Sequence, residues 1–269
     1  MAGRRRRILD KPRRLVQAGM LIRFLRPLLI ALALAGLAPA ALAQGYSPAA
    51  AQVIGRAFAA SGGAGWYLLR GWRESGQVGG APYERWMDPV RYGLREEVRE
   101  PHGLSIAGFN GQAFWRVAPD GAMTAVNDHA ALAQARTTAF FEGGLYLFPG
   151  RFGAKGDYLG VRRLKGRAYQ VVNVTPWNGR PRELWFDAAS HLLGRIVDRT
   201  GPRPRAVAVQ DYRKVGPVRV AFRYTPEGAG QGLARQIETL AFTPADRGLF
   251  SLDREQAVAK VRAAALPKP

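Results

Sequence analysis

The sequence predicts an α+β fold that is mainly β: a strongly curved antiparallel sheet, or incomplete barrel, with helices covering its concave face. Short strand-like runs follow one another and are separated by tight turn signals, which favours hairpins because parallel strands need long crossovers. About ten such strands are more than an open sheet carries without curling. The 32 glycines and 18 prolines also suit a turn-rich fold.

Residues 1–43 are predicted to be a secretory signal peptide. Basic residues come first, and the stretch from Pro27 to Ala43 is uncharged and ends in Ala-Leu-Ala. This run is shorter than the roughly 20 residues that a membrane span needs. We therefore expect cleavage after Ala43 and a periplasmic location, with Met20 as an alternative start. The remaining chain divides into one domain at 44–250 and a C-terminal helix and tail at 251–269.

The first expected element after the signal is a helix. Ser47 is a suitable N-cap, Pro48 fits the first helical position and Gly62-Gly63 ends the helix. Its apolar stripe, which needs a partner surface, consists of Val53, Ile54, Ala57 and Phe58.

Strand-like runs follow in two groups on either side of a second helix. Asn110-Gly111 is a strong signal for a two-residue hairpin. The second helix is expected from Asp128 to about Phe141, before Gly143-Gly144. The runs cover 66–78, 83–88, 91–98, 103–109, 112–117 and 123–126, then 157–164, 167–175, 181–186, 192–197, 205–215, 218–224 and 233–243.

Chemical motifs are absent from the sequence. The lack of cysteine excludes disulfides, thiolate metal sites, a cysteine nucleophile and a lipid-modified N-terminal cysteine. His102, His129 and His191 have no metal-ligand spacing, and turn or helix-start positions explain them. Ser105 lies in a near match to the G-x-S-x-G motif, but a hairpin follows it and not a helix. We expect no enzyme, no cofactor and no metal.

The charge of +20 also limits the choice of partner. The basic residues are spread along the chain and do not cluster as in a nucleic-acid footprint, so we expect no nucleic acid. Biased composition explains the excess, and attraction to anionic lipid headgroups at a membrane surface is the alternative.

Apolar residues give the positive signal. Neighbours such as Phe114-Trp115 and Leu184-Trp185-Phe186 interrupt a clean alternation. Such runs indicate that both faces of the sheet are covered or that one face lines a cavity. An ordinary core and a ligand-lining wall both fit these residues.

The order of these segments resembles the periplasmic lipoprotein-sorting carriers, the LolA/LolB-like family, over about residues 47–250. The matching stretches are Glu84–Pro89, Tyr92–Glu97, Gly108–Trp115 and Arg182–Asp187. The resemblance implies an incomplete barrel around a hydrophobic cavity that holds acyl chains beneath helices, without catalytic residues. It also implies an arginine on an early strand that tunes lid closure, for which Arg91 and Arg95 are the candidates.

These observations lead to one main hypothesis and one alternative. The main hypothesis is a soluble, monomeric periplasmic protein that binds lipid or lipoprotein acyl chains for transfer or sensing. Its lid would be the helix at 128–141 and the run to Phe148, hinged at Gly143-Gly144. The alternative is a protein-interaction module of the cell envelope with the same fold and a filled interior. The candidates for the cavity and lid are Trp72, Trp86, Leu94, Phe109, Trp115, Phe140, Phe141, Leu145, Phe148, Tyr169, Trp185 and Phe222.

Overall fold

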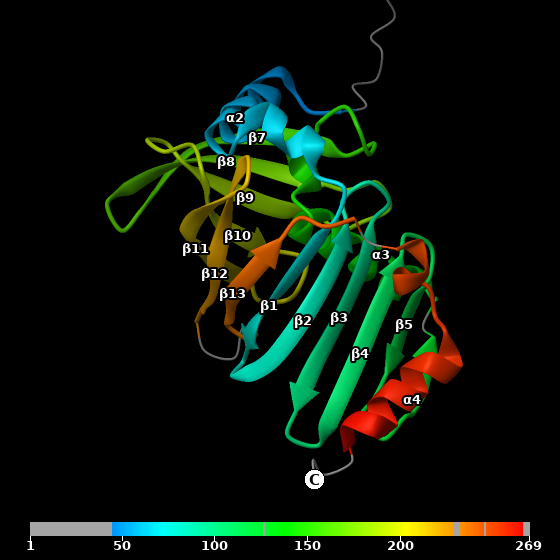
Figure 1. Ribbon diagram of the computed structural model, residues 1–269. Helices are drawn as coiled ribbons and strands as arrows, with labels where there is room; N and C mark the ends of the chain where they lie inside the picture. Colours follow the sequence, from blue (N-terminus) through cyan, green and yellow to red (C-terminus); the bar gives the residue numbers. More distant parts are fainter. Residues whose placement is uncertain (1–44, 126, 229–231, 245, 266–269) are drawn as a thin grey trace, which may run out of the picture. The chain divides into compact units, whose positions relative to one another are not determined.

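Antiparallel pairing joins the strands of the described residues into one sheet that curls without closing (Figure 1). The computed structural model describes residues 45–125, 127–228, 232–244 and 246–265, and within these ranges the sheet has thirteen strands. This confirms the expected mainly β fold and incomplete barrel. The predicted signal peptide lies outside the described residues.

The sheet consists of two meanders. The first contains β1 (Trp72–Val78), β2 (Ala81–Asp88), β3 (Gly93–Glu100), β4 (Gly103–Asn110), β5 (Phe114–Val117) and β6 (Met123–Ala125). The second contains β7 (Lys155–Leu164), β8 (Arg167–Thr175), β9 (Arg182–Asp187), β10 (Leu193–Asp198), β11 (Arg205–Val215), β12 (Val218–Glu227) and β13 (Arg235–Ala241). The last strand pairs with the first, β13 with β1, and this contact connects the two meanders.

Tight turns set the register of the hairpins. Gly79 and Gly80 both have positive φ, which the two-residue turn between β1 and β2 requires. The two-residue hairpin predicted at Asn110-Gly111 was wrong, because β5 begins only at Phe114. The Asn110 side chain instead accepts hydrogen bonds from the backbone N–H of Gln112 and Ala113, and this widens the loop.

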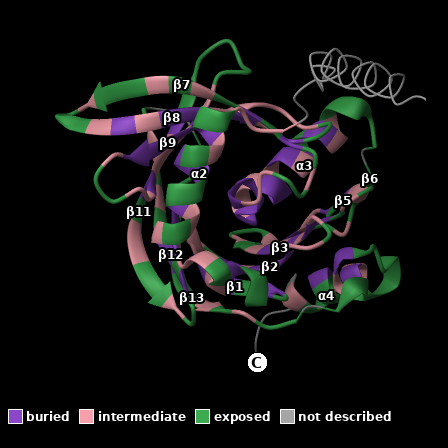
Figure 2. Cartoon of the chain, turned by 90° about the horizontal axis from the view of Figure 1, so that it is seen from above, coloured by how far each residue is buried: buried purple, intermediate pink, exposed green. Residues whose placement is uncertain are grey.

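Helices α2 (Pro48–Ala60) and α3 (His129–Glu142) lie within the curve of the sheet (Figure 2). Both begin as predicted. Ser47 Oγ accepts a hydrogen bond from Ala50 N–H, and Asp128 Oδ1 accepts one from Ala131 N–H. The buried stripe of α2 and Phe140 of α3 belong to the main hydrophobic core together with strand residues of both meanders.

Two short 3₁₀ helices follow these α-helices: η1 (Gly63–Leu68) after α2 and η2 (Leu145–Leu147) after α3. The prediction that a strand begins at Trp66 was therefore wrong. Gly62 and Gly63 have positive φ and turn the chain back, and Trp66 Nε1 donates a hydrogen bond to Ser61 Oγ. The strand starts only at Trp72.

The last described helix lies on the outer face of the sheet. After η3 (Arg247–Phe250), helix α4 (Arg254–Ala265) packs on β4 and β5, beside the first meander and away from α3. Its core consists of Leu104, Ile106, Trp115, Val117, Ala257 and Val261. This part of the sheet is consequently covered on both faces. No helix of the described residues is long and apolar enough to cross a membrane.

Candidate functional site beneath helix α3

A small, partly open cavity of about 40 Å³ lies inside the curved sheet. Aromatic side chains form much of its wall, including Trp66, Trp72, Tyr146 and Phe186. A water needs roughly 10–15 Å³ of such volume, so this cavity has room for a few waters and not for a lipid chain. The interior is therefore nearly filled in this conformation.

An open groove of about 440 Å³ lies next to the cavity, and α3, the strand pair β1 and β2, and strands β9 to β13 contribute to its lining. Four side chains line both spaces and separate them: Phe141, Glu142, Ile196 and Tyr224. The groove falls in the size range of ligand pockets, roughly 300–1,000 Å³. Its other apolar side chains are Val78, Val207 and Leu233, and its cations are Arg85, Arg182 and Arg235.

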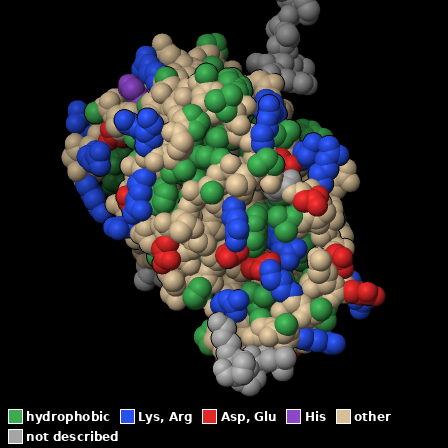
Figure 3. All heavy atoms as spheres, in the orientation of Figure 1, with side chains coloured by type: hydrophobic (Ala, Val, Ile, Leu, Met, Phe, Trp, Pro, Cys, Tyr) green, Lys and Arg blue, Asp and Glu red, His purple; other side chains and the backbone are tan. Residues whose placement is uncertain are grey.

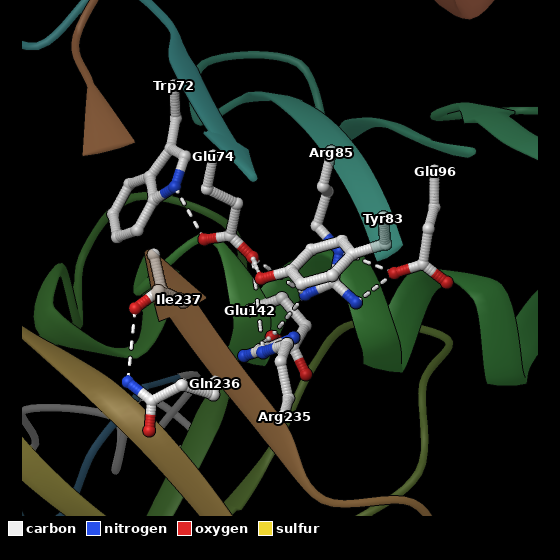
Figure 4. A network of polar contacts seen from close by, with 9 residues as sticks. All are labelled: Trp72, Glu74, Tyr83, Arg85, Glu96, Glu142, Arg235, Gln236 and Ile237. Atoms are coloured by element: carbon white, nitrogen blue, oxygen red, sulfur yellow. Dashed lines mark hydrogen bonds and ion pairs between the residues drawn. The ribbon is translucent and has the colours of Figure 1, made fainter. Parts of the chain in front are cut away.

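A network of buried and partly buried charges (Figure 4) contributes Arg85, Glu142 and Arg235 to the lining of this groove. Glu74 on β1 is only 1% exposed. It accepts hydrogen bonds from Trp72 Nε1 at 2.8 Å and from the Tyr83 hydroxyl at 2.9 Å. Arg85 Nη1 on β2 is 3.4 Å from the same carboxylate, and Arg85 also pairs with Glu96. These contacts give the buried Glu74 charge the partners that it needs.

Glu142, the last residue of α3, completes the network from the helix side. Its Oε2 accepts from Arg85 Nη1 at 3.0 Å and lies 2.5 Å from Arg235 Nη2. Burial raises the pKa of Glu142 to about 7, Arg85 opposes this shift, and the carboxylates of Glu74 and Glu96 add to it. The end of α3 is thus attached to the sheet by a carboxylate that is costly to keep charged.

Arg235, at the start of β13, has an unmet donor. Its side chain is 8% exposed and its guanidinium lies 4.1 Å above the ring of Tyr224. Its Nε is buried and has no hydrogen-bond partner among the described residues, although Glu74 Oε1 is 3.9 Å away. A buried donor without a hydrogen bond is rare enough to call for an explanation.

Eight of the twelve predicted cavity and lid residues lie on the inner side of the sheet. Trp72 and Phe141 line the small interior cavity. Phe109 packs against Ala135 and Ala139 of α3. The other five belong to the main core or pack against it: Leu94, Phe140, Leu145, Phe148 and Phe222.

The other four predicted residues lie on the outer face. Trp115 is under η3 and α4, where its Nε1 donates to Phe250 O, and Trp86 lies next to Arg73 and Lys260. Tyr169 and Trp185 form a separate outer cluster. Their neighbours along the strands, such as Met87, Leu184 and Phe186, point inward instead.

Neither arginine predicted at the lid contacts α3 through a described ion pair. Arg91 is half-exposed in the turn before β3 and pairs with Asp88 at 3.2 Å. Arg95 is buried on the outer face, where it donates to Glu97 and to Leu249 O. Arg85 and Arg235 contact the end of α3 instead. A sequence signal for Arg85 existed, because it shares the inward alternation of Tyr83 and Met87.

The three histidines occupy turn or helix-start positions. His102 lies in the turn between β3 and β4, His129 is the first residue of α3, and His191 has positive φ in the turn before β10. Among the described residues, no group of three or more histidine and carboxylate side chains could hold a metal ion.

Comparison with known proteins places the fold. No family model and no curated protein matches the sequence. Among solved structures, a domain from Vibrio parahaemolyticus described as an outer membrane lipoprotein-sorting protein matches with a TM-score of 0.50 and 11% identity, over 78% of this chain and 98% of that one. A LolA superfamily protein from Nitrosomonas europaea matches with a TM-score of 0.48 and 10% identity, over 76% and 98%. The chain shares its fold with the Vibrio parahaemolyticus domain, and this agrees with the resemblance noted in its sequence.

Proposed function

We propose that this chain is a periplasmic protein that binds an acyl chain of a lipid or lipoprotein in its interior, without catalysis. One observation carries the proposal: an open, partly apolar groove shares four lining side chains with the small interior cavity. Moving those side chains would merge the two spaces. The merged space would shelter an acyl chain, whose transfer from water gains about 0.8 kcal/mol per methylene.

Helix α3 is the movable part of that lining. Phe141 and Glu142 are its last two residues, and Gly143 and Gly144 follow directly. Gly144 has a φ of 68°, a conformation that glycine adopts without strain, and it begins η2. A hinge at this pair would swing the end of α3 away from β13 and carry Phe141 out of the space between groove and cavity.

Uptake of a neutral fluorescent lipid probe such as N-phenyl-1-naphthylamine tests the proposal. The exported chain should take up the probe with saturation, and organic extracts of protein purified from its host should contain lipid. A non-saturating signal, together with lipid-free extracts, would contradict acyl-chain binding. Whether cargo is passed to a partner or sensed is decided afterwards, by transfer from labelled to unlabelled vesicles.

The second candidate is a protein-interaction module with a filled interior. The small size of the interior cavity favours it, and so does an apolar patch at the end of the molecule where α2 lies (Figure 3). In this patch Tyr67 is 58% and Leu68 69% exposed, beside the rings of Phe58 and Phe148. This function predicts no probe uptake. It also predicts that Leu68→Ser abolishes capture of a partner from envelope extract. If the first candidate is right instead, Leu68→Ser leaves probe uptake unchanged.

A further inference from the structure

The charge network beneath α3 contains a carboxylate that comes from the movable element. Glu74 and Glu96 sit on strands, whereas Glu142 is the last residue of α3, and its side chain is 28% exposed. When α3 moves, Glu74 and Glu96 stay with the sheet and Glu142 leaves. The arginines then lose one anionic partner, and an anion from elsewhere could replace it.

Arg235 has the geometry to receive such an anion. In arginine, Nε–H and one N–H of Nη2 lie in the guanidinium plane along the same edge, and together they match the two oxygens of a carboxylate or phosphate. Glu142 engages Nη2 at 2.5 Å, while Nε has no hydrogen bond among the described residues. Glu142 therefore uses only one of the two donors on this edge of Arg235.

The position of Arg235 also suits the polar end of an amphiphile. Arg235 lines the open groove together with Val78, Leu233 and Tyr224, and Tyr224 also lines the interior cavity. An acyl chain that passes Tyr224 into the interior would leave its headgroup at Arg235. The arginine and the apolar wall thus match the two ends of one molecule.

We propose that Arg235, supported by Arg85, binds the acidic headgroup of the lipid, a carboxylate or a phosphate, and that Glu142 occupies this site in the closed state. The inference rests on the proposed function and adds the chemical class of ligand. The headgroup takes the place of Glu142, so charge in the network is conserved. A neutral amphiphile that enters the interior also moves Glu142 away with α3, but it gives the arginines no anion in exchange.

Displacement of the neutral probe by three matched amphiphiles tests this inference. Dodecanoate, dodecyl phosphate and dodecanol share one chain and differ in the headgroup, and each is used below its aggregation concentration. Each anionic ligand that the site accepts should displace the probe at a concentration about tenfold lower than dodecanol, as one added charge-assisted pair predicts. Comparing the two anions distinguishes a carboxylate from a phosphate headgroup.

Two variants and one control variant test whether the effect arises at this site. Arg235→Gln should bring the anionic ligand to within about threefold of dodecanol, whereas the exposed arginine variant Arg163→Gln on β7 should behave as wild type. Because Arg235→Gln leaves Glu74 with fewer partners, folding is checked, and Glu142→Gln provides a second test. Glu142→Gln changes the contact that holds the end of α3 on the sheet, so affinity for the anion and for dodecanol should change in the same direction, and the preference for the anion should stay at about tenfold.

The outcomes distinguish a failure of this inference from a failure of the proposed acyl-chain binding. Equal displacement by anions and dodecanol in the wild type, or a Glu142→Gln variant that loses the preference for the anion, would overturn the headgroup site and leave acyl-chain binding intact. A probe that does not bind wild type or either variant would overturn both.

Discussion

Helices α3 and α4 lie on opposite faces of the same sheet, and both cover arginine–glutamate pairs. Beneath α4 and η3 the polar groups are satisfied: Arg95 donates to Glu97 and to Leu249 O, and Lys260 also pairs with Glu97 at 2.6 Å. Beneath α3, Arg235 keeps an unmet donor next to an open groove. The same pairs of residue types therefore form a fully hydrogen-bonded layer beneath α4 and a site with one unsatisfied donor beneath α3.

The largest effect is expected on the outer face, beneath α4. Trp115 is 2% exposed, and its ring lies against Gly108, where a Cβ would be 2.2 Å from it. Trp115→Ala should lower the free energy of unfolding by about 3–5 kcal/mol, because it leaves a cavity beneath α4. Denaturant unfolding measures the loss, and probe affinity of the folded fraction should not change. A loss of affinity with unchanged stability would reverse the roles assigned to the two faces.

The next effect is expected at the wall beneath α3. Phe141→Ala should join groove and cavity and raise affinity for the neutral probe about tenfold, at a cost of about 1–2 kcal/mol since Phe141 is only partly buried. Phe140→Ala is the matched control. Phe140 is fully buried, so its removal should cost about 3–5 kcal/mol without raising affinity. If both variants bind the probe equally, Phe141 does not separate the two spaces.

A smaller effect is expected from pH. Glu142 has a pKa of about 7 in the closed state, against 4.5 for an ordinary glutamate. The closed state thus binds the proton more tightly than the open state, and its added stability is present below pH about 4.5 and lost as pH rises through about 7. The groups that face Glu142 are Arg85 and Tyr83 from β2, Glu74 from β1, Glu96 from β3, Arg235 from β13, Tyr224 from β12 and Tyr146 from η2.

The rate of neutral-probe uptake should therefore rise severalfold between about pH 5 and pH 8. Stopped-flow fluorescence measures it, and Glu142→Gln should remove most of the dependence because glutamine does not titrate. A wild-type rate that falls with pH would contradict the assignment to Glu142.

The smallest effect is expected at Arg91, which the sequence suggested as a lid residue. Its ion pair with Asp88 is half-exposed, so Arg91→Ala should change stability by no more than about 0.5 kcal/mol. Probe affinity and its pH dependence should match wild type. A clear change in either would place a functional contact outside the groove described above.

The sequence predicted most of the hairpins, the caps of α2 and α3 and the curled antiparallel sheet, but it placed the turn at Asn110-Gly111 wrongly. The caps and the correct hairpins depend on local signals such as Ser47, Asp128 and the paired glycines Gly79 and Gly80. The sequence did not predict which aromatic residues face inward. The first meander carries α3 inside and α4 outside, so both faces are apolar there, and hydrophobicity alone cannot separate Trp72 from Trp115.

The sequence also did not predict the charge network, because the network depends on the topology of the sheet. Arg85, Glu142 and Arg235 are far apart in the chain, and they meet because β2 and β13 both pair with β1 and the last residue of α3 contacts Arg85 on β2 and Arg235 on β13. No local pattern predicts the pairing of a last strand with a first. In β1 and β2, Glu74 and Arg85 occupy positions that alternate with more exposed ones and face inward. A charged residue at an inward position of a strand is the sequence signal that could have revealed the network.

Movement of α3 on lipid binding is the most direct test of the account. The chain has no cysteine, so spin labels can be attached at Gln134→Cys on α3 and Gln210→Cys on β11, both exposed positions. A reference pair uses Glu255→Cys on α4 with the same β11 site. Bound dodecanoate should lengthen the α3–β11 distance measured by pulsed electron paramagnetic resonance and leave the α4–β11 distance unchanged. An α3–β11 distance that stays constant at saturating dodecanoate would contradict an interior that opens beneath α3.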